Sequence, residues 1–115
     1  MHDYHDATLL TASVTWETGT TVLTFKLCLE PEQKVSLVIR DTVFFEWPRR
    51  FPWGKSVSVN GMKATAVNGN DRQQQVEIEM QSGDKIIVIG KEVLEDGERL
   101  FYNGRYSPCR ARRRT

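Results

Sequence analysis

Residues 10–29 read LTASVTWETGTTVLTFKLCL, and this stretch decides the fold class. Apolar and polar residues alternate on both sides of Thr18-Gly19, and a period of two is the spacing of side chains on a β-strand. We expect a hairpin centred on Thr18-Gly19, because that register places the apolar residues of both strands on one face. The predicted cross-strand pairs are Trp16 with Thr21, Val14 with Leu23, Ala12 with Phe25 and Leu10 with Leu27.

The same period continues downstream. Apolar residues of one phase run through residues 35–47, and Asp41 interrupts them. One straight strand of that length would exceed the usual size, so we expect a bulge or a corner near Arg40-Asp41. Trp47-Pro48 and Phe51-Pro52 then end the strand pairing, because proline has no amide hydrogen to donate.

Turn signals divide the rest of the chain. Asn60-Gly61 favours a type I′ turn that would pair Val59 with Met62 and Val57 with Ala64. Residues 68–74 read as an exposed loop.

The C-terminal third contains one more clear hairpin. Ser82-Gly83 joins strands at residues 76–80 and 85–89, and the second strand is apolar in both phases. We expect a short helical turn at 91–97 and a last strand at 99–106 around Asn103-Gly104. Together these patterns predict an all-β fold, a small antiparallel barrel or sandwich of six to seven strands built from consecutive hairpins.

Length and composition predict one domain. The chain has 115 residues, and we expect an all-β domain over residues 1–107 and a basic, disordered tail over 108–115. Residues 109–114 carry four arginines, and without these four the 16 basic residues fall to 12 against 15 acidic ones. The N-terminus lacks a cationic and apolar signal, and no apolar run has membrane-spanning length, so we expect a cytoplasmic protein that does not bind membranes.

Residues suited to catalysis or metal binding are sparse. His2, Asp3, His5 and Asp6 lie close together, but this polar segment reads as a lead-in that Tyr4 anchors to the core. Cys28 and Cys109 lack a CxxC partner, and Glu77 and Glu79 fit the solvated face of a strand. We therefore expect no catalytic site, no metal and no cofactor.

The most aromatic stretch, FFEWPRRFPWGKSVSV at residues 44–59, is the candidate binding segment. Tryptophan and arginine are the side chains most often found as interface hot spots, and two prolines stiffen the loop. We expect Phe45 and Trp47 to be buried, and Arg49 and Arg50 to be exposed. The predicted partner-binding residues are Trp47, Arg49, Arg50, Phe51, Trp53 and Lys55.

These residues favour binding of another protein. One alternative is single-stranded nucleic acid, because arginines and aromatic rings supply phosphate contacts and stacking platforms. A second alternative is a small ligand held in a barrel mouth. Pairing of an exposed edge strand would also allow a homodimer.

Four segments carry a resemblance to a known group of proteins: YHDATLL, WETGT, FPWGKSVSVNG and EMQSGDKIIV. Over residues 4–90 the chain resembles a group of small bacterial all-β proteins, which are similar to the immunity proteins that accompany polymorphic toxins. The resemblance implies a protein that inhibits a partner by binding it. It assigns no binding residue, because such proteins diverge at the interface.

Overall fold

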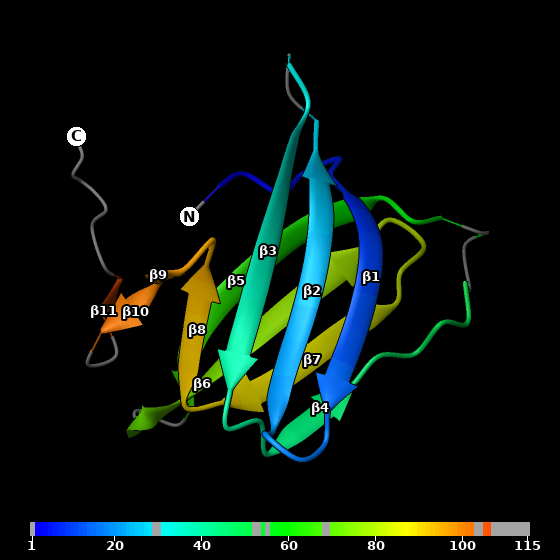
Figure 1. Cartoon of the computed structure of the whole chain (residues 1–115). Coiled ribbons are helices and arrows are strands. Elements are labelled where there is room, and N and C mark those ends of the chain that lie inside the picture. The colour runs from blue at the N-terminus through cyan, green and yellow to red at the C-terminus, as the bar shows by residue number, and fades with distance from the viewer. Residues whose placement is uncertain are drawn as a thin grey trace.

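The computed structural model describes residues 2–28, 31–51, 54, 56–67, 70–102 and 105–106. Two antiparallel sheets pack face to face and do not close into a barrel, so the all-β prediction is confirmed in its sandwich form (Figure 1). The first sheet has the strand order β1 (Thr8–Thr15), β2 (Thr20–Leu27), β3 (Gln33–Arg40), β8 (Glu92–Glu95) and β9 (Glu98–Arg99).

The second sheet crosses behind the first (Figure 1). Its strand order is β4 (Phe44–Glu46), β7 (Lys85–Gly90), β6 (Asn70–Met80) and β5 (Val59–Val67). A short separate hairpin pairs β10 (Phe101–Tyr102) with β11 (Arg105–Tyr106), in the region where we expected a last strand. Residues 107–115, which include the basic tail, lie outside the described residues.

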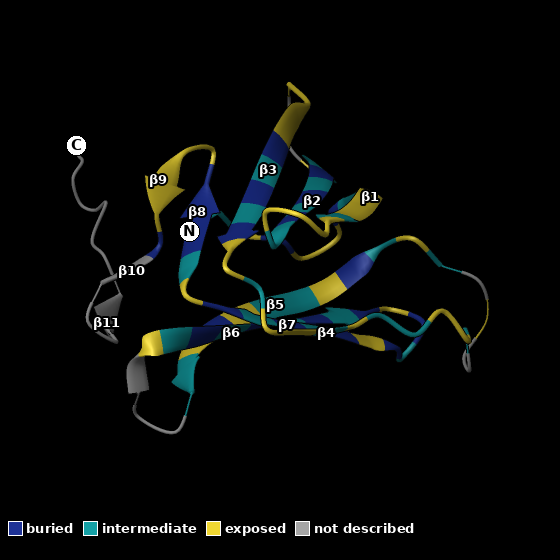
Figure 2. Ribbon diagram, turned by 60° about the horizontal axis from the view of Figure 1, so that its bottom comes forward, coloured by how far each residue is buried: buried dark blue, intermediate teal, exposed yellow. Residues whose placement is uncertain are grey.

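The core lies between the two sheets. One phase of β2 and β3 faces one phase of β6 and β7, and these side chains are almost fully buried, as the alternating colours of Figure 2 show. Each such side chain stabilises the fold by roughly 1.5–3 kcal/mol relative to an exposed one. The central residues are Leu23, Phe25, Leu37, Ile39, Ile78 and Val88.

The β1–β2 hairpin forms, but its predicted register is wrong. Thr15 pairs with Thr20, Val14 with Thr21 and Ala12 with Leu23. The turn contains four residues, because the Gly19 N–H donates to the Thr15 carbonyl at 2.9 Å and Gly19 has a φ of 70°.

A bulge also interrupts β1. The register shifts between Leu9 and Thr11, so Leu10 is an extra residue on this strand. Leu10 and Trp16, predicted to line the apolar face, are both exposed.

The predicted hairpin at Asn60-Gly61 is also wrong. These residues lie within β5, at a bulge where Val59 pairs with Met80 and Gly61 with Glu79. The segment before the bulge cannot fold back on β5, because it is already paired: the Val59 N–H donates to the Ala7 carbonyl at 2.8 Å.

The loop predicted at residues 68–74 is wrong as well. Strand β6 begins at Asn70, and Gln74 is only 3% exposed. Residues 68–69, between β5 and β6, lie outside the described residues. The strand extends this far because Gln74 and Gln75 pair with β5 on one side and β7 on the other.

The corner predicted near Arg40-Asp41 is confirmed. Strand β3 ends at Arg40, Asp41 has a φ of 53°, and the chain then enters the other sheet as β4. The hairpin around Ser82-Gly83 is also confirmed, with Ile78 opposite Ile86.

The helical turn predicted at residues 91–97 does not form. Residues 92–95 form β8, in which Val93 pairs with Ile39 of β3 and is fully buried. The chain reverses only at Asp96-Gly97, where both residues have positive φ. The described residues contain no helix, so none that could span a membrane occurs among them.

Tyr4 anchors the N-terminal segment, as predicted. Its side chain is 3% exposed, and its ring meets Phe25 edge-on with centroids 4.9 Å apart. The hydroxyl donates to Glu95 Oε2 at 2.5 Å. Burial and this hydrogen bond raise the pKa of Tyr4 far above its usual value.

Candidate functional site

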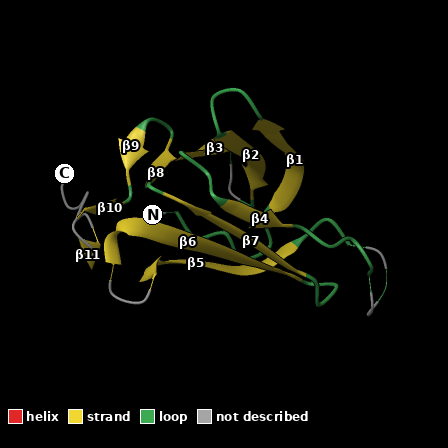
Figure 3. Cartoon of the chain, turned by 90° about the horizontal axis from the view of Figure 1, so that it is seen from below, coloured by secondary structure: helices red, strands yellow, loops and turns green. Residues whose placement is uncertain are grey.

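One side of the sandwich is open and apolar. It contains β1 and β4, which are edge strands of different sheets, and the described residues (47–51, 54, 56 and 57) of the segment 47–57 that leads from β4 to β5; we call it the open side (Figures 1 and 3). The exposed large hydrophobic side chains of the described chain all line its two grooves. They are Leu10 (44% exposed), Trp16 (84%), Val43 (60%), Phe44 (47%) and Val57 (51%).

The first groove separates β1 from the segment 47–57. Its volume is about 350 Å³, and Leu10, Trp47, Phe51 and Val57 supply apolar wall. Asp84 and Ser82, from the turn between β6 and β7, add polar groups to the lining.

The second groove lies at the other end of β1. Its volume is about 400 Å³, and it is lined by Val14 and Trp16 on one side and by residues 42–45 on the other. Both grooves therefore have β1 as one wall and the second sheet, or the chain that extends from it, as the other. An extended patch of this kind marks interaction sites more often than a scatter of single apolar residues does.

A buried carboxylate fixes the backbone of Arg50 and Phe51. Asp84 is 2% exposed, and its Oδ2 accepts the N–H of Phe51 at 2.7 Å and that of Arg50 at 3.0 Å. The Ser82 hydroxyl donates to the same oxygen at 3.3 Å. Asp84 Oδ1 accepts no hydrogen bond from the described residues, and the Arg50 Nε lies 3.6 Å away from it.

These contacts keep Asp84 ionised. Burial would raise its pKa, but hydrogen bonds from the Phe51 and Arg50 amides and from Ser82, with the Arg50 charge, outweigh it and lower the pKa below its usual value. The role of this carboxylate is thus to bind the backbone amides of residues 50–51.

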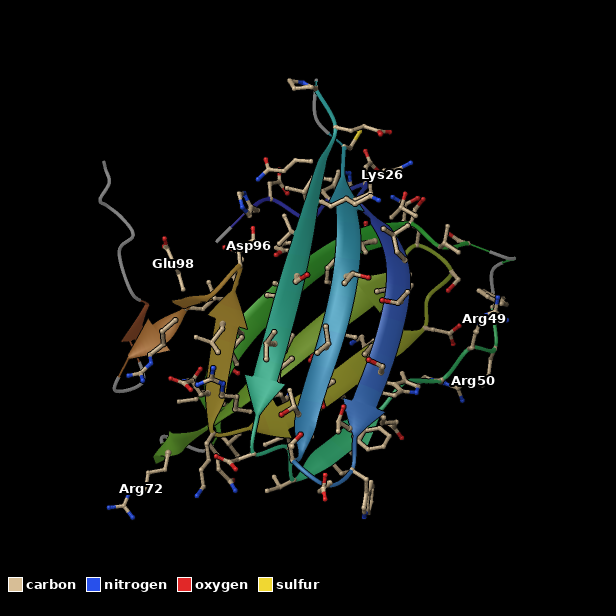
Figure 4. All side chains as sticks on the ribbon, viewed as in Figure 1. Lys26, Arg49, Arg50, Arg72, Asp96 and Glu98 are labelled. Carbon is tan, nitrogen blue, oxygen red and sulfur yellow. The ribbon has the colours of Figure 1, made fainter. Side chains whose placement is uncertain are left out.

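The predicted binding segment has mixed roles. Trp47 is half-buried and stacks on Phe45 with ring centroids 4.6 Å apart, and both pack against the core. Arg49 and Arg50 are exposed as predicted and point outward (Figure 4). The Arg49 guanidinium lies 4.6 Å from the centroid of the Phe51 ring. Trp53 and Lys55 lie outside the described residues.

Sequence reasoning missed three of the five apolar residues that define the open side. It placed Leu10 and Trp16 inside the hairpin, and Val43 in a buried phase. A usable signal was present in residues 7–16, which contain no charged residue. Natural edge strands are usually protected by charges, by proline or by a bulge, so an edge strand without charge or proline is a candidate for pairing with another strand.

The N-terminal polar residues act as structural contacts. The His5 Nδ1 lies 2.7 Å from the Asn60 carbonyl, and the Gln81 side chain donates to Asp6 Oδ1 at 2.6 Å. These contacts tie the segment before β1 to β5 and to the turn after β6. Within the described part of the chain, no three His, Cys, Asp or Glu side chains come together as metal ligands would.

Comparisons with protein-family models, with curated proteins and with solved structures gave no match.

Proposed function

We propose that this protein is a non-enzymatic protein-binding module that takes an extended segment of its partner along the outer edge of β1. The main support for this proposal is the open side, where the exposed large hydrophobic residues of the described chain line two grooves beside an edge strand. Addition of a strand to a sheet edge is a recurring mode of recognition, in which main-chain hydrogen bonds supply affinity and side-chain pockets supply specificity.

The outer edge of β1 offers unpaired backbone groups. Its first residues are covered, because the Leu9 N–H donates to the Val57 carbonyl at 2.9 Å and Thr8 bridges to Ser58. From Leu10 onward, no strand among the described residues pairs with this edge. Every second residue of an antiparallel strand directs its N–H and C=O away from its partner, so these groups are available for a new ladder.

The side chains around this edge supply apolar contact area. The second groove is lined by Trp16, Phe44 and Val43, and the first groove by Leu10 and Val57. Aromatic residues are enriched in interface cores, and charged residues are depleted there. A partner segment that fits would be extended and uncharged, with small or apolar side chains at alternate positions.

Arg49 supplies a cation at the rim of this surface. It is exposed and stacked on Phe51, whereas Arg50 is paired with Asp84. The resemblance to immunity proteins supports a module that inhibits its partner by covering part of the partner's surface. The alternative of a ligand inside a barrel has less support, because the two sheets do not close into one.

A selection experiment tests this proposal without a known partner. A library of short displayed peptides is selected against the purified full chain, and the enriched peptides are titrated into the protein while its amide resonances are followed by NMR. We expect shifts concentrated at residues 10–16 and 43–44, because an added strand contacts those backbones. Selected peptides should resemble uncharged strands.

The control distinguishes the edge from non-specific apolar adhesion. An Ala12→Lys variant places a charge on exposed β1, and it should lose the selected peptides. A Gln33→Lys variant places the same charge at an exposed position of β3 and should retain them. Failure to enrich any peptide, or shifts confined to β8 and β9, would contradict the proposal.

A further inference from the structure

We propose that the strand taken up by β1 is the β1 strand of a second copy of this chain, so that the protein forms a two-fold symmetric dimer. The inference rests on the proposed function and names the partner of that surface. A partner strand must be extended and uncharged, with small or apolar residues at alternate positions. Residues 10–16, LTASVTW, meet this description themselves.

The part of the β1 edge that pairs with no strand of the described chain has a definable midpoint. It begins at Leu10, after the residues held by the segment 57–59, and extends to Trp16 in the turn. Its midpoint is Ser13. An antiparallel pairing centred on Ser13 therefore uses the whole of this part of the edge. A pairing centred on Ala12 would instead place Trp16 opposite Thr8, which is already bridged to Ser58.

The sequence is self-complementary about this centre. Hydroxyl-bearing residues meet hydroxyl-bearing residues, and apolar residues meet apolar ones, as a two-fold interface requires. The resulting pairs are Ser13 with Ser13 of the second copy, Ala12 with Val14, Thr11 with Thr15, and Leu10 with Trp16.

The pairing also covers exposed apolar surface. Trp16 and Leu10, which are 84% and 44% exposed, would come together at both ends of the interface. Ala12 and Val14 pair with Leu23 and Thr21 on the inner face of β2, so a second strand would continue that face. Directly opposed apolar pairs of this type stabilise a sheet.

Charge and space both permit this contact. No charged residue lies between Ala7 and Trp16, so no like charges are brought together. The chain between β4 and β5 meets the edge of β1 at Thr8 and Leu9, through Ser58 and Val57. From Leu10 to Thr15, no strand of the described chain pairs with this edge. The dimer would join two five-stranded sheets into one continuous sheet.

Formation of a closed two-fold dimer explains why the uncharged edge strand β1 is tolerated. A long uncharged edge strand is a template for open-ended aggregation. A two-fold pairing uses the edge of both copies at once, so the assembly ends at two.

Sedimentation equilibrium of the full chain gives the first test. We expect a reversible monomer–dimer equilibrium. Ser13→Lys would oppose two ammonium groups at the centre and raise the dissociation constant at least about tenfold, because like charges that face each other across an interface repel. Gln33→Lys, at an exposed position of β3, should leave the dissociation constant unchanged. A monomer at all concentrations, or a Ser13→Lys variant that dimerises normally, would overturn the dimer.

Cysteine cross-linking tests the register itself. In a background with Cys28→Ser and Cys109→Ser, a Ser13→Cys variant should form a disulfide dimer under mild oxidation, since directly opposed Cβ atoms lie about 5 Å apart. A Thr15→Cys variant should not, because its two sulfurs would be four residues apart along the strands, roughly 13 Å. If Ser13→Cys does not fold, mixed Thr11→Cys and Thr15→Cys chains should cross-link to each other. Cross-linking at Thr15 alone would overturn the register.

The two proposals fail differently. If the chain is monomeric but selected peptides still shift residues 10–16, the second copy is excluded and β1 remains a binding edge. If neither a dimer nor peptide binding at β1 is found, both proposals fall.

Discussion

Asp84 holds the backbone of Phe51 across 33 residues of sequence: its Oδ2 accepts the Phe51 N–H at 2.7 Å. Phe51 has a φ of 53°, a conformation that costs a non-glycine residue energy unless its surroundings impose it. The carboxylate and the Arg50 amide supply that constraint, so one wall of the first groove depends on a side chain from the β6–β7 turn.

Replacing Asp84 should loosen this wall. An Asp84→Asn variant loses the charge that strengthens the hydrogen bonds from the amides of Arg50 and Phe51. We expect faster hydrogen exchange at those two amides, with the protection of Leu37 and Val88 in the core retained. Ser82→Ala is the matched control and should have a smaller effect, because it removes only two long hydrogen bonds, one donated to Asp84 Oδ2 at 3.3 Å and one accepted from the Asp84 N–H at 3.4 Å. Unchanged exchange at both amides would argue against the constraint.

The same carboxylate predicts a pH dependence. The folded pKa of Asp84 is lowered, so its stabilisation is fully present above the unfolded pKa of about 3.9 and is lost as the pH falls through the folded pKa. The difference in Tm between wild type and Asp84→Asn should therefore be constant near neutral pH and shrink in acid. A difference that stays constant throughout the acid range would mean that the charge of Asp84 contributes nothing.

Gly90 should be intolerant of a side chain. A Cβ at this position would meet Ile39 Cγ2 and would lie 2.7 Å from the Arg40 carbonyl oxygen, at the corner between the sheets. We expect Gly90→Ala to lower the free energy of unfolding by about 1–3 kcal/mol, measured by denaturant titration. Gly61→Ala is the control, because its Cβ would meet nothing within 4 Å. Equal effects of the two substitutions would contradict the close approach.

Trp16 should matter for association and little for folding. Its side chain is 84% exposed, so Trp16→Ala should change the free energy of unfolding of the monomer by no more than about 0.5 kcal/mol. The dissociation constant of the dimer should rise at least about tenfold, because tryptophan is a typical interface hot spot. Sedimentation equilibrium and dilute-solution unfolding measure the two quantities separately. Loss of folding stability without loss of association would show that Trp16 is structural.

The period of two was sufficient to predict the fold class. Alternation placed Leu23, Phe25 and Val35 correctly in the core, and the misplaced polar Asp41 located the corner between sheets. These predictions succeed because side-chain direction along a strand is a local property.

Register and turn type were not predictable in the same way. Asn60-Gly61 has the composition of a hairpin turn, yet it forms a bulge, because Val59 is held by the distant Ala7. Leu10 belonged to the predicted apolar face, yet a bulge in β1 shifts the register there. Both outcomes depend on long-range pairing, which periodicity does not encode.

The candidate site was predicted only in part. Trp47, Arg49 and Phe51 do line a groove, whereas Arg50 does not, and Trp47 also stacks on Phe45. The open side emerges only when β1 and β4, distant in sequence, are seen as neighbouring edges.

Hydrogen exchange of the β1 amides is the most direct test of the binding edge. It compares the free, dilute protein with the protein saturated by a selected peptide or by its own second copy at high concentration. Binding at this edge predicts strong new protection within residues 10–16, with core amides of β3 and β7 unchanged. Protection that appears at β5 or β9, while residues 10–16 exchange as in the free protein, would contradict the claim that β1 is the binding strand.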